Sequence, residues 1–437
     1  MNTLKELKSG SLVGNMRVKI AEGLNTFPKA LYTLADSLEI LDLTDNNLST
    51  LPDDLNRLHK LKILFVSNNQ FKEVPPVLAS CPNLTMIGLR NNQISTFVEG
   101  AVPLSTRWLI LTDNALKTLP DSMGDLALLQ KCMLSGNHLT SLPKSMAQCH
   151  NLELLRIAVN KLTELPTWLT TLPKLSWLAY SGNPFCDKHP NCDTTLKEIT
   201  WEVLEIKEIL GEGASGLISK AIVENKEVAV KVFKGDITSD GLPEEEMDIN
   251  ISMGHHDHLV DVLARVTGHP EGKDVLMLEL IPSHFFNLGL PPTLQTCSRD
   301  VYPEGFTLTF AHAIKILKGM ADAAVHMHKR GIMHGDFYAH NIMIDAEANN
   351  ILGDFGGASY YEPKEVEVRN GLERLEVRAF GCLVEELLGL SKKDSKNTLL
   401  RNKLITLKNS CLTSKTEERP LFSEIFEHLV EIEIKNV

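Results

Sequence analysis

An asparagine that recurs every 22 or 23 residues is the strongest constraint on the first half of this 437-residue chain. The recurring positions are Asn46, Asn69, Asn92, Asn114, Asn137, Asn160 and Asn183. Apolar residues stand five and three positions before each Asn and, in six of the seven units, eight positions before it, as in Leu38, Leu41 and Leu43. A fixed period of this length indicates a solenoid in which each unit contacts only its neighbours.

The residue types within one unit fit a short strand followed by a turn. Alternating apolar side chains bury one face of the strand, and the Asn amide can bond backbone groups that the turn leaves unpaired in the interior. A Leu-Pro or Val-Pro pair marks the return of most units, as at Leu51, Val74 and Leu119. These units resemble leucine-rich repeats of the short intracellular type, which implies an α/β solenoid of about seven clear repeats with a cap at each end.

The 23-residue pattern stops near residue 198, so the chain is expected to be multidomain. We predict a leucine-rich-repeat domain over residues 1–198 and a second domain over residues 199–437. Residues 12–37 are expected to form a degenerate first repeat or cap. The block after Asn183 would close the other end, because a solenoid needs polar termini.

A row of apolar side chains is expected to line the concave face of the solenoid. It comprises Ile40, Ile63, Met86, Trp108, Leu154 and Trp177, with Phe65, Ile110 and Met133 beside them. Contiguous exposed apolar area usually marks a partner surface, so a protein substrate or regulator is predicted to bind there. The alternative is that aliphatic residues on such strands merely shield one another.

Composition limits the class of protein. The net charge of −12 argues against general affinity for nucleic acid or anionic lipid. No apolar run reaches the length of a membrane span and the first residues lack a signal-peptide core, so a cytoplasmic location without a membrane span is expected. The eight cysteines show no disulfide spacing. Cys186, His189 and Cys192 could bind a metal, but their spacing fits no common zinc motif, which favours a structural end cap.

Three glycines open the second half of the chain. Gly211, Gly213 and Gly216 form G-x-G-x-x-G between two strand-like runs, and no helix pattern follows, which argues against a dinucleotide-binding loop. The next strand, "EVAVKVF", carries Lys231. A strand hairpin over phosphates with a lysine on the next strand is the arrangement of protein kinases. From about residue 200 onward the chain resembles the eukaryotic-type protein kinase family, which implies a bilobal α+β fold that uses ATP and Mg²⁺.

The resemblance implies an ATP site in the first part of this domain. Its expected residues are Leu210, Gly211, Glu212, Gly213, Gly216, Ile218, Ala229, Lys231, Glu246, Glu279 and Ile281. Leu210 and Ile218 would flank the adenine, and the backbone from Glu279 to Ile281 would bond it behind a gatekeeper, Leu278. Glu246 is expected to hold Lys231, with Glu245 as the alternative.

The stretch "HGDFYAHN" at residues 334–341 is similar to the catalytic loop of the family. The resemblance implies that Asp336 orients the attacking hydroxyl and accepts its proton, and that Asn341 holds magnesium. Asp354, in an Asp-Phe-Gly sequence, would be the principal metal ligand. Lys231, Asp336 and Asn341 are thus the expected catalytic set. A helical pattern over residues 310–328 leads into the loop.

The C-terminal part agrees with the family in two further places. Glu376 stands where the family has an aspartate on a buried helix, and Arg419 is similar to the arginine of the closing motif. The segment from the Asp-Phe-Gly sequence to Glu376 is short and lacks an Ala-Pro-Glu motif. The usual partner of Arg419 is therefore missing, so Glu362 or Glu373 is expected to take its place.

The catalytic loop itself departs from the family at two positions. Gly335 replaces the arginine that pairs with a phosphorylated activation loop, so switching by that route is not expected. Tyr338 replaces a lysine that contacts the transferred phosphate in serine/threonine kinases. Losing that cation would cost about a few kcal/mol in the barrier, which slows catalysis without abolishing it.

Three functional hypotheses remain at this point. The first is an ATP- and Mg²⁺-dependent protein kinase, serine/threonine-type, whose repeats recruit a substrate or regulator. The alternative is a pseudokinase scaffold whose repeats bind protein and whose kinase fold is weak or inactive. A small-molecule phosphotransferase is the third, since such enzymes also use a His-Gly-Asp loop. The joint presence of Lys231, Asp336, Asn341 and Asp354 favours the first.

Overall fold

The computed structural model describes residues 1–186, 196–213, 215–235, 238, 240–361, 366–392 and 397–434. These residues form two compact units, one of Met1–Lys174 with Asn183–Phe185 and one of Leu175–Gly182 with Cys186–Val437. The domain division near residue 198 stays a prediction. His189 and Cys192, two of the three possible metal ligands, lie outside the described residues.

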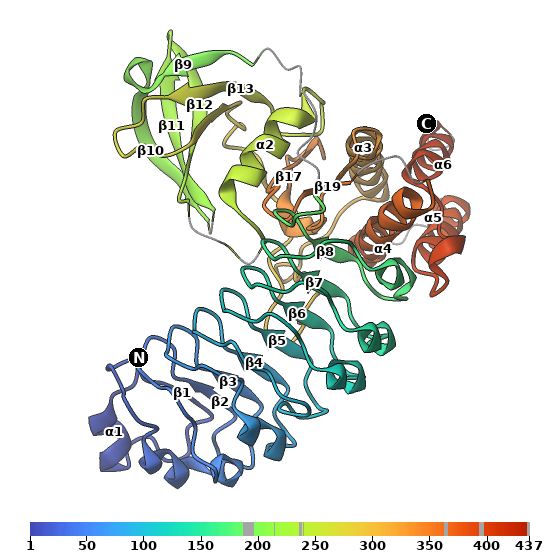
Figure 1. The fold of residues 1–437 in the computed structure, drawn as a ribbon. Helices are drawn as coiled ribbons and strands as arrows, with labels where there is room; N and C mark the ends of the chain where they lie inside the picture. The colour runs from blue at the N-terminus through green and yellow to red at the C-terminus, as the bar shows by residue number, and fades with distance from the viewer. Residues whose placement is uncertain are drawn as a thin grey trace. The chain divides into compact units, whose positions relative to one another are not determined.

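The first unit is built from three-residue parallel strands. They are β1 (Arg17–Lys19), β2 (Ile40–Asp42), β3 (Ile63–Phe65), β4 (Met86–Gly88), β5 (Trp108–Ile110), β6 (Lys131–Met133) and β7 (Leu154–Arg156). Each pairs with its neighbour in the sequence at the same repeat position, so that Ile40 lies opposite Ile63 and Ile63 opposite Met86. The parallel sheet of this unit has the order β1 to β7 (Figure 1). The next repeat strand in the sequence, β8 (Trp177–Ala179), is part of the second unit.

Short 3₁₀ helices form the return of most repeats. They are η1 (Lys29–Leu34), η2 (Leu55–Arg57), η3 (Pro76–Ser80), η4 (Asp121–Asp125), η5 (Lys144–Gln148) and η6 (Thr167–Thr171). A proline precedes five of them, because its fixed φ suits the entry to a helix. Residues 12–37 contain β1 and η1 and are therefore a repeat. The helix before it, α1 (Leu4–Ser9), was not predicted from the sequence, although it begins with a Thr3–Glu6 capping box.

The recurring asparagines bond the backbone between repeats, as predicted. Asn46 Nδ2 donates to the carbonyls of Ile20 and Leu43 at 2.8 and 2.9 Å, and its Oδ1 accepts from the Leu24 N–H at 2.9 Å. Asn69, Asn92, Asn114, Asn137, Asn160 and Asn183 also bond the preceding repeat. The ladder thus satisfies interior backbone groups that the turns leave unpaired.

The second unit begins with a sheet lobe. Its strands are β9 (Glu198–Thr200), β10 (Glu205–Glu212), β11 (Gly216–Val223), β12 (Lys226–Phe233), β13 (Val262–Thr267) and β14 (Val275–Leu278), in the order β10-β11-β12-β14-β13-β9. The short helix η7 (Trp201–Val203) joins β9 to β10. Helix α2 (Pro243–Met253) lies beside the sheet (Figure 1) and packs Met247 against Ala229, Phe233 and Leu276.

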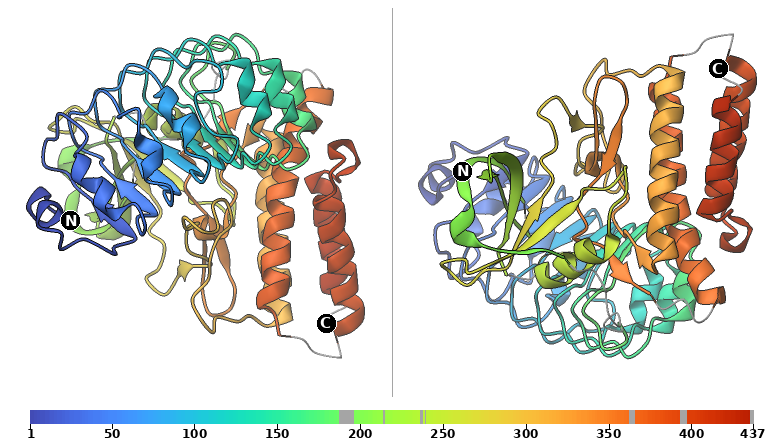
Figure 2. Two further views of the ribbon diagram at one scale, coloured as in Figure 1. Left: turned by 90° about the horizontal axis from the view of Figure 1, so that it is seen from below. Right: turned by 90° about the horizontal axis from the view of Figure 1, so that it is seen from above.

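A helical lobe follows. Its helices are α3 (Phe310–Lys329), α4 (Val366–Leu390), α5 (Thr398–Cys411) and α6 (Phe422–Ile434), with the short η8 (Ala339–Asn341) and η10 (Thr416–Glu418). Helix α3 packs against α6, and α4 packs against α5 (Figure 2). The helix predicted over residues 310–328 is confirmed, because its apolar positions are buried along one side and Thr309 caps its start.

Short strands connect the helical lobe and carry the functional loops. Strands β15 (Phe286–Asn287), β17 (Ile342–Ile344) and β18 (Asn350–Leu352) form one small sheet, and β16 (Ile332–Met333) pairs with β19 (Ser359–Tyr360). A solenoid and a two-lobed α+β unit are thus both present, as expected. No helix among the described residues is both long enough and apolar enough to cross a bilayer.

Candidate active site

The glycine-rich sequence connects β10 and β11, which are antiparallel. The Gly213 N–H donates to the Gly216 carbonyl at 2.9 Å, which closes the turn. A Cβ atom at Gly216 would lie 2.7 Å from the Val232 carbonyl, so glycine is needed there for packing. A Cβ atom at Gly211 or Gly213 would meet no atom within 4 Å. The fold itself does not require these two glycines, and their backbone is open to a close approach by phosphate.

Lys231 on β12 and Glu246 on α2 form an ion pair. Glu246 is buried and Lys231 is half-buried, and Lys231 Nζ also lies 4.9 Å from the centre of the Phe233 ring. Of the two glutamates considered from the sequence, it is Glu246 that contacts the lysine. Helix α2 therefore holds the lysine side chain in one position.

The proposed adenine end of the site lies on β12 and β14. Ala229 stands opposite Leu278, and both side chains are buried. The Glu279 N–H donates to the Asp261 carbonyl at 2.9 Å, so Glu279 would offer adenine its carbonyl only. Ile281 is half-buried, as is Ile218.

Two residues of the glycine-loop hairpin that were assigned to the ATP site are open to solvent. Leu210 and Glu212 both lie at the end of β10, and both are exposed. Lys234 Nζ bonds Glu212 Oε1 at 2.7 Å, and this contact lowers the pKa of Glu212 below its ordinary value.

The loop from His334 to Asn341 is organised by its own side chains. Asn341 Nδ2 donates to the Asp336 carbonyl at 2.9 Å and to Asp336 Oδ2 at 3.1 Å. The Gly353 N–H donates to the Asn341 carbonyl at 2.9 Å, which links the loop to the segment that carries Asp354. Since the amide nitrogen of Asn341 bonds Asp336, the amide oxygen is the atom that suits a cation.

Asp354 lies near several other carboxylates. Asp354 is exposed, but neighbouring protein atoms displace part of the water around its carboxylate, and this loss raises its pKa above the ordinary value. The carboxylates of Glu246, Asp336 and Asp240 raise the pKa further, while Lys231 lowers it. The backbone of Asp354 has a φ of +56°, a region where Asp is tolerated better than most residues. An excess of carboxylates of this kind suits a divalent cation.

The donor atoms fit magnesium coordinated jointly with a nucleotide. Asn341 and Asp354 supply oxygen ligands, which Mg²⁺ prefers, and Mg²⁺ commonly takes only one or two carboxylates together with phosphates and water. Within the part of the chain that the structure describes, no three His, Cys, Asp or Glu side chains are grouped to hold a metal by themselves. The site therefore fits Mg²⁺ bound with ATP rather than an all-protein metal centre.

Comparison with known families agrees with this geometry. Residues 204–373 match the model of the protein kinase domain, and residues 36–101 match a leucine-rich-repeat model. The chain carries a leucine-rich-repeat region followed by a protein kinase domain.

The chain is similar to several protein kinases at low identity. An L-type lectin-domain containing receptor kinase of Arabidopsis thaliana is 25% identical over 223 residues, which are 44% of this chain and 29% of that protein. A probable LIM domain-containing serine/threonine-protein kinase of Dictyostelium discoideum is 24% identical over 272 residues, 54% of this chain and 40% of that protein. A proline-rich receptor-like protein kinase of A. thaliana is 27% identical, over 48% of this chain and 31% of that protein. The chain spans less than half the length of these relatives.

Glu376 on α4 holds the backbone of the catalytic loop of this kinase domain. Its carboxylate accepts the N–H groups of His334 and Gly335 at 3.2 and 2.8 Å, and it lies 2.9 Å from His328 Nε2. Burial alone would raise the pKa of Glu376, but the contacts with His328 and with the loop outweigh it and lower the pKa. The role expected at this position is therefore filled by a glutamate.

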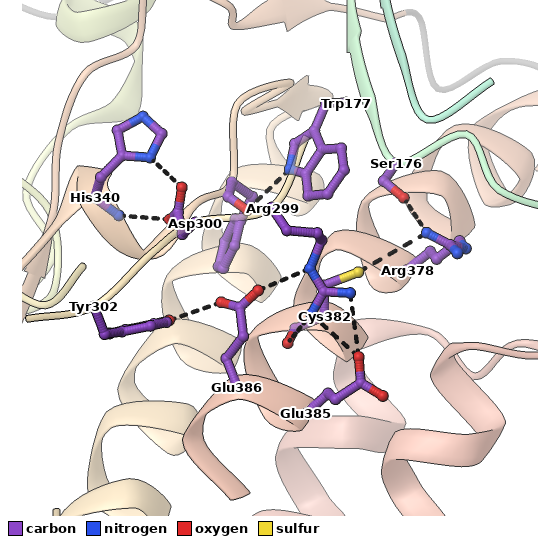
Figure 3. A network of polar contacts seen from close by, with 11 residues as sticks. Ser176, Trp177, Arg299, Asp300, Tyr302, His340, Arg378, Cys382, Glu385 and Glu386 are labelled. Atoms are coloured by element: carbon purple, nitrogen blue, oxygen red, sulfur yellow. Dashed lines mark hydrogen bonds and ion pairs between the residues drawn. The ribbon is translucent and has the colours of Figure 1, made fainter. Parts of the chain in front are cut away.

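A second support of the loop was missed in the sequence. Asp300 Oδ2 accepts the His340 N–H at 2.9 Å, and its Oδ1 lies 2.7 Å from His340 Nδ1. The neighbouring Arg299 bonds Glu385 and Glu386 on α4 (Figure 3). Burial lowers the pKa of His340, but the contact with Asp300 outweighs it and raises that pKa. No motif marks Asp300, because its segment has no periodic pattern that links it to the loop.

The expectation of an exposed apolar stripe on the repeats is wrong for several members. Ile63, Met86, Leu154 and Trp177 are buried, and the other predicted members are half-buried. Trp177 in particular contacts the catalytic loop within the second unit, where its ring stacks on Tyr338. The sequence placed Trp177 with the other repeats because its strand has the same pattern as theirs.

Arg419 is buried in the helical lobe beneath α4. It donates to the carbonyls of Thr413 and Arg374, each at 3.1 Å, and burial lowers its pKa to about 10. Of its two predicted partners, Glu373 accepts the Phe422 N–H at 2.8 Å, and Glu362 lies outside the described residues. The pairing of Arg419 with either glutamate stays a prediction.

Proposed function

We propose that this chain is an ATP- and Mg²⁺-dependent protein kinase that transfers the γ-phosphate to a serine or threonine hydroxyl. The observation that carries the proposal is the ion pair between Lys231 and Glu246. In protein kinases this pair must be in place for phosphoryl transfer, because it sets the lysine that binds the phosphates. Asp336, Asn341 and Asp354 complete the set of groups that such a transfer needs.

The roles of the residues follow from their contacts. Bound Mg²⁺ and ATP would supply the transferable phosphate and neutralise its charge, held by Asn341 and Asp354. Lys231 binds phosphate oxygens while Glu246 fixes its position. Asp336 accepts the proton of the acceptor hydroxyl, and Asn341 restrains the Asp336 carboxylate through Nδ2. Phosphoryl transfer depends on such placement of charge more than on covalent chemistry.

Two considerations support a protein hydroxyl as the acceptor. The D. discoideum relative is named as a serine/threonine-protein kinase, and the match to the protein kinase model covers the sheet lobe and the catalytic loop. We propose in addition that the repeats bind the protein substrate or a regulator, as leucine-rich repeats commonly present a binding surface.

The proposal is tested by incubating the full chain with γ-labelled ATP, Mg²⁺ and a panel of protein acceptors. We expect label on protein, found on serine or threonine after acid hydrolysis, and its loss on removal of Mg²⁺ with a chelator. Lys231→Met is expected to reduce incorporation by about 10²-fold or more. Equal labelling by the wild type and Lys231→Met, or label on small metabolites alone, would refute a protein kinase.

A pseudokinase scaffold is the second candidate, and the replacements at Gly335 and Tyr338 favour it. A pseudokinase that binds nucleotide would show thermal stabilisation by Mg²⁺ and ATP without turnover. Ligand present at about 100 times its Kd stabilises by about 2.7 kcal/mol, which such a melting experiment resolves. Stabilisation that is lost in Asp354→Asn, with no label transferred by the wild type, would decide for this candidate.

A further inference from the structure

The strand β8 belongs to the same compact unit as the kinase domain, although its sequence is that of a leucine-rich repeat. The segment Leu175–Gly182 contacts the catalytic loop, β19 and α4. None of these contacts is required by the repeat pattern. They raise the question of what the segment does for the kinase domain.

Trp177 contacts Phe337 and Tyr338, the two residues that directly follow the catalytic aspartate. Its indole ring stacks on the ring of Tyr338, with the ring centres 4.3 Å apart and the planes 5° from parallel. Its Nε1–H donates to the Phe337 carbonyl at 3.2 Å (Figure 3). Trp177 is 1% exposed and Tyr338 is 5% exposed, so the stack is a packed contact and not a surface one. Tyr338, which stands in place of the family's lysine, is therefore part of this contact.

Gly335 lies against the same strand, β8. Its φ is +71°, and a Cβ atom there would lie 2.6 Å from the Leu178 carbonyl and 2.3 Å from the Gly357 carbonyl. Any side chain, including the arginine of the family, would collide with β8 at this point. The two departures of the catalytic loop from the family therefore both lie at contacts with β8, and at Gly335 the Gly357 carbonyl crowds the same position.

Polar contacts fix the strand on either side of the stack. The Tyr180 N–H donates to Ser359 Oγ at 3.1 Å, and Ser359 lies on β19, which pairs with the strand before the catalytic loop. On the other side, Arg378 Nη1 on α4 donates to Ser176 Oγ at 2.8 Å (Figure 3). The strand is thus held at three points along its length, so it can restrain the loop.

We propose that Trp177 is a positioning residue for phosphoryl transfer, through which β8 holds the catalytic loop in its working geometry. This inference rests on the proposed function. In the family, the arginine at the position of Gly335 restrains the loop through a phosphorylated activation segment. Here a strand encoded by the last repeat supplies the restraint permanently, without phosphorylation.

The opposite effect, in which β8 blocks the site, fits the contacts less well. Trp177 bonds the backbone of Phe337 and the ring of Tyr338, and both of these residues are buried. Asp336 next to them stays half-buried, so its carboxylate is not sealed off. The strand therefore contacts the loop beside the catalytic carboxylate and leaves that carboxylate uncovered.

The experiment compares Trp177→Ala, Trp177→Phe and Trp168→Ala with the wild type, each as the full chain. Trp168 is the control, since it is a half-buried tryptophan on η6 in the first unit, outside the apolar row. We expect Trp177→Ala to lower kcat by about 10- to 100-fold with the KM for ATP nearly unchanged, because a misplaced catalytic group affects the chemical step. Trp177→Phe keeps a stacking ring but loses the N–H donor, so its kcat should lie between those of the wild type and Trp177→Ala. Trp168→Ala should match the wild type.

Hydrogen exchange of the amides in residues 334–341 gives a second readout that does not need turnover. Trp177→Ala should exchange faster in this loop than Trp168→Ala, while both keep the melting transition of a folded chain. An unchanged or raised kcat in Trp177→Ala, or unchanged exchange in the loop, would overturn the inference. If the wild type transfers no phosphate, the proposed function fails and the positioning role for transfer falls with it. Faster exchange would then still show that β8 restrains the loop.

Discussion

At the scale of single residues, the catalytic loop is shaped by contacts that lie far away in the sequence. Compared with the family, the loop has lost two basic residues, because Gly335 replaces an arginine and Tyr338 replaces a lysine. In the structure Gly335 lies against the Leu178 carbonyl and Tyr338 lies under Trp177. Both residues are packed against other parts of the chain, so the two replacements do not by themselves decide between a slow kinase and a pseudokinase.

The first prediction concerns Gly335→Ala. The new methyl group would collide with the carbonyls of Leu178 and Gly357 at a positive φ, so we expect a loss of about 2 kcal/mol or more in the free energy of unfolding. Gly389→Ala on α4 is the control, since a Cβ atom there meets nothing within 4 Å. Alanine favours helix at that site by about 0.5–1 kcal/mol. Urea denaturation of the two variants measures the difference, and equal stability would contradict the crowding at Gly335.

The second prediction concerns Glu376→Gln. The amide would place an N–H₂ group against a backbone N–H or His328, which leaves buried donors without an acceptor. We expect destabilisation by about 3–5 kcal/mol at neutral pH, measured by urea denaturation. Glu367→Gln, at an exposed position on the same helix, should change stability by no more than about 0.5 kcal/mol. A small effect at Glu376 would show that its carboxylate does not hold the loop.

The pH dependence of that pair of proteins follows from the lowered pKa of Glu376. A carboxyl group whose pKa falls on folding stabilises fully above its unfolded pKa of about 4.3 and loses this effect as the pH falls through the folded pKa. The stability difference between wild type and Glu376→Gln should therefore be constant from pH 7 to about pH 5 and shrink at lower pH. A difference that grew on acidification would reverse the sign of the argument.

At the scale of elements, the repeats contain a second periodic position besides the asparagine. The residue before each ladder Asn has a positive φ, and these residues are Asp45, Asn68, Asn91, Asp113, Gly136, Val159 and Gly182. Asp, Asn and Gly are the residues that adopt this region most easily. The sequence shows Asp, Asn or Gly at six of these seven positions, but the predicted repeat was based only on the asparagine that follows. Val159 is the exception.

The third prediction uses that exception. A β-branched residue at positive φ costs about 1–2 kcal/mol, so Val159→Asn should stabilise the repeat region by about 1 kcal/mol. The reciprocal change, Asp113→Val, puts valine into the same backbone conformation two repeats earlier and should destabilise by a similar amount. Thermal or urea denaturation of both variants checks the pair. Shifts of the same sign would show that backbone strain does not decide stability here.

At the scale of the whole molecule, the sequence predicted the order of the elements better than their partnership. The 23-residue period and the sequence of kinase motifs are local patterns, so the solenoid and the two-lobed domain followed from them. The assignment of β8 to the second unit could not be predicted, because Trp177 occupies the same position in its repeat as Trp108 does. The support of His340 by Asp300 was missed for the same reason, since a contact between irregular segments leaves no period.

We propose that this catalytic loop transfers phosphate although it lacks the arginine and the lysine of the family. The most direct test is the rate of γ-phosphate transfer to protein by the full chain, measured beside Asp336→Asn at equal concentration with Mg²⁺. Because the proposed role of Asp336 is to orient the hydroxyl and accept its proton, the wild type should be faster by about 10²- to 10⁴-fold. Equal rates for the two proteins would contradict the account and leave the kinase fold as a scaffold.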